Sequence, residues 1–341
     1  LKIGGWNNLV SAVEPTHFNM FLPADHPDFP WIGMVFAPPI IGIWYWCTDQ
    51  YIVQRVLSAK NITEARKGTI FAGYLKLLPI FMFFIPGLIA YAMTKSGQLS
   101  YASSDQVFPT LVRELLPSGI RGLVAGGLLV ALMSSLSSVF NSCSTLFTMD
   151  IYKKLYPETS AKKLVFVGRI ATGIVVLSGI MWIPFIKVVS GAGLYTYLQS
   201  VQAYIAPPIA SVFLLGLFWS RINSNGALVA LVGGFMAGMV RLGLEIKKTT
   251  LMVDGIWYKI ADLNFLYFAI FSFLACVIVL ISVSLFTDPP DLNKISGLTY
   301  DTVKSEDDES VDLKSDKINS FVILAILALI LLYFSPIGIG G

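Results

Sequence analysis

The stretch that decides the fold is residues 264–286, NFLYFAIFSFLACVIVLISVSLF, which contains no charged side chain. A helix needs about 20 consecutive apolar residues to cross the hydrocarbon core of a bilayer. Similar runs recur along the 341-residue chain, which is 55% hydrophobic and only 13% charged. Soluble domains usually carry about 25% charged residues. The composition therefore favours a membrane protein and nearly excludes an ordinary soluble one.

Eight segments have the length and apolar character of membrane-spanning helices. They are predicted at Trp31–Leu57, Glu64–Thr94, Gly119–Tyr152, Leu164–Ile186, Leu194–Trp219, Gly226–Leu244, Asn264–Phe286 and Ile318–Phe334. We therefore expect an all-α membrane protein with about eight transmembrane helices, surrounded by lipid bilayer. Residues 1–30 predict a turn-rich loop at the membrane surface. Residues 288–317 predict a solvated loop, with an acidic run at 306–309.

Prolines predict interruptions in several of these spans. Pro38-Pro39 lies in the first span, Pro79 and Pro86 lie in the second, and Pro207-Pro208 lies in the fifth. Proline removes a helix donor and clashes with the preceding turn. Such breaks persist at membrane depth only where neighbouring groups or a water-filled cavity satisfy the backbone, and they are typical of transporter cores. The alternative is that membrane helices simply tolerate proline.

The distribution of basic residues predicts the orientation. If residues 1–30 lie outside and the chain crosses eight times, 14 Lys and Arg residues fall in inner loops and nine in outer segments. The positive-inside rule favours this arrangement. The C-terminus is then expected to be extracellular or periplasmic, and loop 288–317 to be cytoplasmic.

Two ionisable residues stand out within the apolar spans, Lys76 and Asp49. A charge at the centre of a membrane helix costs about 2.5–3.5 kcal/mol on insertion scales, so such residues usually face a cavity or a partner. Lys76 is predicted to donate hydrogen bonds inside a hydrated pocket, or else to extend to the inner interface. Asp49 has a simpler alternative, an ion pair with Arg55 or Lys76.

The segment Trp44–Gln50, WYWCTDQ, places aromatic and amide side chains together. Aromatic rings stack on the apolar faces of sugars, while Gln and Lys bind hydroxyls, and binding pockets mix apolar walls with a few polar groups in this way. Gln199 and Gln202 could add further amides. The alternative for the aromatic residues is an interfacial belt.

The third span carries a polar stripe. Small polar residues recur at helical spacing on one face: Ser134, Ser138, Asn141, Ser142 and Thr145. Close packing of membrane helices explains such a stripe. A Na⁺ site explains it equally well, because hydroxyl and carbonyl oxygens without carboxylates suit a monovalent ion better than a divalent one.

No enzyme constellation is present in the sequence. The only histidines, His17 and His26, lie in the opening loop, and the three cysteines form no metal-binding cluster. Phosphate-loop and dinucleotide fingerprints are absent, and a net charge of +3 is too balanced for nucleic-acid binding. We therefore expect neither an enzyme, nor a nucleic-acid-binding protein, nor an organic cofactor.

Three stretches resemble the sodium:solute symporter family, in its sodium/glucose (galactose) cotransporter branch. They are WYWCTDQYIVQR at 44–55, GYLKL at 73–77, and SSL at 134–136 continuing to NSCSTLFTMDIY at 141–152. Weaker support comes from residues 197–199 and 207–219. The similarity extends over roughly residues 31–240.

The resemblance implies a core of five plus five helices related as inverted repeats. Residues 31–219 would form the second repeat, residues 220–341 three peripheral membrane helices, and residues 1–30 an extracellular loop. The chain begins with Leu rather than Met, and the first repeat is expected to be a missing N-terminal part of the same protein.

The resemblance also implies particular site residues. Tyr45 would be the gate that closes the solute site from the inside. The residues implied to bind the substrate are Trp46, Lys76, Gln199 and, beside them, Gln50. The implied Na⁺ ligands are the carbonyl of Ala131 and the hydroxyls of Ser134 and Ser135.

The function implied by the resemblance is Na⁺-coupled symport of a glucose- or galactose-like sugar by alternating access. The implied location is the plasma membrane, or the inner membrane of a bacterium. Two alternatives stay open at this point. One is Na⁺ symport of another small solute, such as a polyol, sialic acid or a carboxylate. The other is a solute sensor built on the same core.

Overall fold

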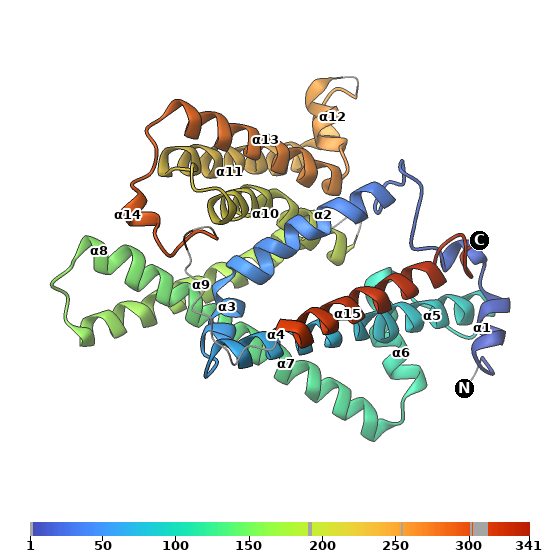
Figure 1. Ribbon diagram of the computed structural model, residues 1–341. Helices are drawn as coiled ribbons and strands as arrows, with labels where there is room; N and C mark the ends of the chain where they lie inside the picture. The colour runs from blue at the N-terminus through green and yellow to red at the C-terminus, as the bar shows by residue number, and fades with distance from the viewer. Residues whose placement is uncertain (1–2, 190–192, 254, 301, 303–312) are drawn as a thin grey trace. The chain divides into compact units, whose positions relative to one another are not determined.

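The computed structural model describes residues 3–189, 193–253, 255–300, 302 and 313–341, and within these ranges the chain is helical without β-strands (Figure 1). The longer helices are α2 (Trp31–Ile43), α4 (Ile62–Leu75), α5 (Ile85–Lys95), α7 (Ser118–Leu146), α9 (Ala161–Val189), α10 (Leu194–Phe218), α11 (Ser224–Ile246), α13 (Phe265–Phe286) and α15 (Leu313–Tyr333). Shorter helices connect them: α1 (Trp6–Ala12), α3 (Gln50–Leu57), α6 (Val107–Leu115), α8 (Lys153–Leu155), α12 (Ile256–Asp262) and α14 (Leu292–Ile295).

Within the described residues, eight helical segments are long and apolar enough to cross a membrane. They are Trp31–Thr48, Ile62–Lys95, Ser118–Leu155, Ala161–Pro184, Leu194–Phe218, Ser224–Ile246, Phe265–Phe286 and Lys314–Tyr333. The predicted all-α class is confirmed, and the eight predicted spans are confirmed in number and order. The acidic run 306–309 of the predicted loop lies outside the described residues.

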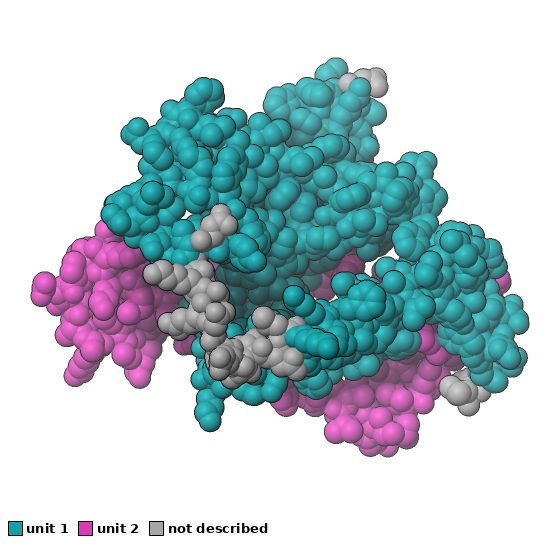
Figure 2. All heavy atoms as spheres, in the orientation of Figure 1, with its two compact units in different colours: residues 1–84, 198–341 teal, residues 85–197 magenta. Residues whose placement is uncertain are grey.

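The chain forms two compact units (Figure 2). The first contains residues 1–84 and 198–341, and the second contains residues 85–197. In the second unit α7 packs against α9, and the Ser144 hydroxyl donates to the Gly168 carbonyl over 2.8 Å. A methyl group at Gly168 would lie 3.1 Å from the Ser144 oxygen. Close approach of the two helices therefore depends on this glycine.

The core of the first unit is formed by α2, α10 and α13. Its buried residues are Ala37, Ile41, Ala203, Tyr204, Ala206, Phe265, Leu266 and Ala269. Many of them are small, which lets membrane helices approach closely, because apolar side chains gain little by leaving lipid. Helix α11 joins this core through glycines that face its neighbours. Gly238 lies against the Tyr204 carbonyl, and Gly234 lies against Pro208 and Cys276.

The proline pairs do not break their helices, so this part of the prediction is wrong. Helix α2 runs continuously through Pro38 and Pro39, and α10 runs through Pro207 and Pro208. Pro207 and Pro208 are fully buried. Pro38 and Pro39 are exposed, on the side of α2 away from the buried Ala37 and Ile41. In both helices the missing N–H groups leave carbonyls one turn earlier without their usual partners. The first span is nevertheless interrupted, six residues beyond the end of α2.

The two ends of the described chain meet at the C-terminal end of α15. The Trp6 indole donates to the Tyr333 hydroxyl over 3.1 Å, and the Met20 amide donates to the Phe334 carbonyl over 2.8 Å. The first and last parts of the described chain therefore lie together at this end of α15.

Helix α11 offers a matched test of the close packing. Gly238→Ala is expected to lower the free energy of unfolding by about 1–3 kcal/mol, because its methyl group would collide with the Tyr204 backbone. Gly243→Ala, on the same helix with open space beside it, is expected to be neutral or to stabilise by up to about 1 kcal/mol. Melting temperatures of the two variants in detergent measure the difference. Equal melting temperatures would contradict the packing role of Gly238.

Candidate functional site

The first span is interrupted at Asp49. Helix α2 passes into the π-helical turn η2 (Trp44–Thr48), and Asp49 then adopts an extended conformation before α3 begins at Gln50. The Asp49 carboxylate accepts a hydrogen bond from the Tyr51 amide at 3.3 Å and so caps α3. An N-cap of this kind satisfies one of the amides left free at the start of a helix. The capping contact gives Asp49 a structural role at the start of α3.

The second span is interrupted at Lys76 and Leu77. Helix α4 ends at Leu75, and the Lys76 amide is shared between the carbonyls of Ala72 and Gly73 at 3.0 and 3.2 Å. Beyond it lies Pro79, which has no N–H to continue the ladder, and then the π-helical turn η3 (Ile80–Phe84). The predicted interruption near Pro79 is therefore confirmed, three residues ahead of the proline.

These two interruptions bring together three of the predicted site residues. The Lys76 ammonium lies 4.9 Å from the centre of the Trp46 ring. The Tyr45 ring meets Trp46 edge to face at 5.2 Å, and the hydroxyls of Tyr45 and Tyr51 are hydrogen-bonded to each other. Trp46 is 42% exposed, and Lys76 is exposed as well. The site thus offers an aromatic face, an ammonium group and phenolic hydroxyls on one accessible surface.

The two glutamines lie on other parts of the same unit. Gln50 is the first residue of α3 and is half-buried, and its amide oxygen has no hydrogen-bond partner in the described structure. Gln199 is half-buried on α10, five residues before the fully buried Tyr204. An unsatisfied buried acceptor such as that of Gln50 is costly unless a ligand or water supplies a donor. The roles of both glutamines in solute binding remain predictions.

The predicted Na⁺ ligands lie on α7 in the second unit. Ala131, Ser134 and Ser135 are exposed and occupy an uninterrupted stretch of helix. At about 100° per residue they share one face. The Ser134 carbonyl accepts from the Ser138 hydroxyl at 3.0 Å, and a helical carbonyl keeps a second lone pair for a further partner. This face presents carbonyl and hydroxyl oxygens, and their binding of Na⁺ stays a prediction.

A buried cluster around Arg241 was not predicted. Arg241 lies on α11, is 3% exposed, and donates to the carbonyls of Ala261 and Leu263 at 2.6 and 2.7 Å. Its guanidinium lies 5.6 Å from the ring centre of Tyr204, whose hydroxyl donates to the Glu245 carboxylate at 2.5 Å. The available signal was that Arg241 is the only basic residue within the predicted span Gly226–Leu244.

Contacts of α15 with α4 were also missed. Asp316 falls in the predicted solvated loop 288–317, but α15 begins at Leu313 and Asp316 pairs with Arg66 at 2.8 Å. The Tyr74 hydroxyl donates to the side-chain oxygen of Asn319 at 3.0 Å. Long-range pairs of this kind carry no periodic signal in the sequence.

Comparison with known proteins places the chain in a family. The model of the sodium:solute symporter family matches residues 5–234. The sodium/myo-inositol cotransporter 2 of Bos taurus is 40% identical over 301 residues, which is 84% of this chain and 45% of that protein. The sodium/glucose cotransporter 1 of Ovis aries is 39% identical over 320 residues, which is 88% of this chain and 47% of that protein. The chain thus spans about half the length of the curated relatives it matches.

The family match covers both interrupted spans, the Trp46–Lys76 contact and the oxygen-bearing face of α7. It confirms the resemblance inferred from the motifs, and it places the chain among transport proteins rather than enzymes. The chain belongs to the sodium:solute symporter family.

Proposed function

We propose that the protein containing this chain is a Na⁺-coupled symporter of a polyhydroxylated ring solute, in the first instance a glucose- or galactose-like sugar. The observation that carries this proposal is the Lys76 ammonium held 4.9 Å from the Trp46 ring at the interruptions of two membrane helices. The Trp46 face suits the apolar C–H face of a sugar ring. Lys76 supplies hydrogen-bond donors for hydroxyls, and Tyr45 beside Trp46 acts as the inner gate.

A second candidate solute is a cyclic polyol. The relatives that match at 39–40% identity include sodium/myo-inositol cotransporters as well as sodium/glucose cotransporters. A cyclohexane polyol offers the same combination of ring hydroxyls and apolar ring face, so Trp46 and Lys76 serve either solute. Gln50 and Gln199, which present amide donors and acceptors, are proposed to distinguish the hydroxyl patterns.

Na⁺ is proposed to bind the carbonyl of Ala131 and the hydroxyls of Ser134 and Ser135. In the proposed organisation, residues 31–219 form the second of two inverted repeats, and the remaining ligands of both sites come from the first repeat. One Na⁺ crossing a potential of 100 mV yields about 2.3 kcal/mol. This supplies the driving force for solute accumulation through alternating access.

The orientation proposed for this transporter places residues 1–30 and the C-terminus outside and loop 288–317 in the cytoplasm of a plasma membrane. The meeting of residues 6 and 20 with residues 333 and 334 supports a common side for the two ends. The excess of basic residues in the inner loops supports the choice of that side.

Uptake of labelled solutes tests the proposal directly. Cells expressing the complete reading frame are expected to accumulate glucose, galactose or myo-inositol in Na⁺ medium and not in choline medium. Accumulation that is independent of Na⁺ would contradict the coupling. Saturable binding of a solute without accumulation would favour the sensor alternative.

Lys76→Ala is expected to raise the solute KM about tenfold or more, since a hydrogen bond to a charged group contributes about 1.5–3 kcal/mol. The Na⁺ concentration for half-maximal uptake should change little. Leu78→Ala, two residues further on and 47% exposed, is the control and should leave both constants near their wild-type values. An unchanged solute KM in Lys76→Ala would remove Lys76 from the site.

Ser135→Ala is expected to raise the half-saturating Na⁺ concentration about tenfold, because the site loses one oxygen ligand of the cation. The solute KM at saturating Na⁺ should stay the same. Ser137→Ala is the matched control, because Ser137 lies about 110° around α7 from the mean direction of the three ligands. Equal effects of the two substitutions would contradict a site on this face.

A further inference from the structure

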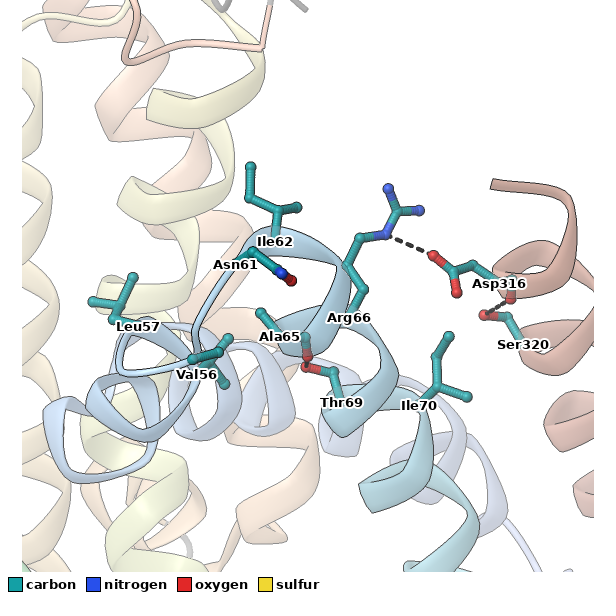
Figure 3. A pocket seen from close by; sticks show the side chains of 11 residues that line it. Val56, Leu57, Asn61, Ile62, Ala65, Arg66, Thr69, Ile70, Asp316 and Ser320 are labelled. Atoms are coloured by element: carbon teal, nitrogen blue, oxygen red, sulfur yellow. Dashed lines mark hydrogen bonds and ion pairs between the residues drawn. The ribbon is translucent and has the colours of Figure 1, made fainter. Parts of the chain in front are cut away.

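Helix α15 runs alongside the second span and in the same direction. Arg66 pairs with Asp316 at 2.8 Å, Tyr74 bonds Asn319 at 3.0 Å, and the rings of Phe84 and Phe334 meet edge to face at 5.1 Å. Later residues of the second span therefore contact later residues of α15. Near its start, α15 contributes Asp316 and Ser320 to an open groove of 510 Å³ that is otherwise lined by α3, the connection to α4 and α4 itself (Figure 3).

The contacts with α15 lie on both sides of the interruption at Lys76 and Leu77. Before it, Gly73 faces Ile323, where a methyl group on the glycine would lie 3.0 Å from the isoleucine side chain, and Tyr74 bonds Asn319. After it, Phe84 packs on Phe334, the residue that directly follows α15. Helix α15 itself is continuous from Leu313 to Tyr333. The continuous helix α15 thus runs past the interruption in the second span.

The hydrogen bond from Tyr74 to Asn319 lies two positions before Lys76 in the second span. Lys76 follows Tyr74 by two positions, which corresponds to about 200° around a helix. Holding Tyr74 toward α15 therefore directs Lys76 to the opposite side of α4, where the Trp46 ring lies 4.9 Å from its ammonium. Without this contact the interruption would act as a hinge, since a few residues at the end of a helix can absorb large changes in backbone angle.

We propose that α15 acts as a splint, meaning a continuous helix that holds the two parts of the interrupted second span in place. Tyr74 and Asn319 are then positioning residues that hold Lys76 against Trp46. The effect of α15 on solute affinity rests on the function proposed above. The contacts themselves are independent of that function. In this arrangement the last helix sets the affinity of a site to which it contributes no ligand.

Kinetics of uptake by the complete protein test the positioning role. Tyr74→Phe is expected to raise the solute KM about three- to tenfold, the effect of one lost hydrogen bond, with the maximal rate per transporter at the cell surface unchanged. Asn319→Ala is expected to have a smaller effect in the same direction, because the Asn319 main-chain carbonyl still lies 3.4 Å from the Tyr74 hydroxyl. The double variant should show no more than the larger single effect. In a Lys76→Ala background neither substitution should change KM further. Leu324→Ala, on the same helix and 62% exposed, is the matched control with no expected effect.

A second measurement separates this proposal from the transport function. Amide hydrogen exchange of purified protein should increase in residues 72–84 for Tyr74→Phe and Asn319→Ala but not for Leu324→Ala. If no solute is transported but this exchange rises, the splint stands and the proposed function fails. Unchanged exchange, or an equal KM effect with and without Lys76, would overturn the positioning role.

Discussion

A backbone amide or carbonyl that lacks a hydrogen-bond partner costs several kcal/mol in hydrocarbon. The helical structure of this chain follows from the need to satisfy these groups within the membrane. Eight long apolar helices satisfy it by their internal hydrogen bonds. The chain departs from regular helix at Asp49 and at Lys76–Leu77, and each departure is compensated locally. The Asp49 carboxylate accepts from Tyr51, and the carbonyls of Ala72 and Gly73 share the Lys76 amide. The interruptions are therefore stable features, and they bring the aromatic and basic side chains together.

Polar contacts between helices fix how these segments pack. The Arg241 guanidinium is buried, but the carbonyls of Ala261 and Leu263, at the C-terminal end of α12, accept its hydrogen bonds and the Tyr204 ring lies beside it. The Tyr204 hydroxyl donates to Glu245 and ties α10 to α11. Buried charges are tolerated only with such partners. Helix α10 is thus held from one side by a polar network and from the other by α2 and α13.

The sequence was sufficient to predict the helical class and the number and order of the spans, since apolar length is a local property. Motifs singled out Tyr45, Trp46 and Lys76, which lie in contact, and their roles in solute binding stay predictions. The prediction of breaks at the proline pairs was wrong, because both helices continue through them. Pro207 and Pro208 are fully buried, so packing supports α10 there, whereas Pro38 and Pro39 are exposed. Contacts such as Arg66–Asp316 depend on which distant segments meet, and no pattern along the chain encodes them. For the same reason, Asp316 was predicted to lie in the solvated loop 288–317, although it belongs to α15.

The pairing of the second span with the last one has a consequence for biosynthesis. Tyr74 meets Asn319, which is made 245 residues later. At a synthesis rate of about 5–20 residues per second, that interval lasts roughly 12–50 s. Throughout this time the second span has its interruption at Lys76 and Leu77, and Arg66 lacks its partner Asp316, because α15 has not yet been made. Insertion machinery or lipid headgroups must shield this surface until translation of the final helix is complete.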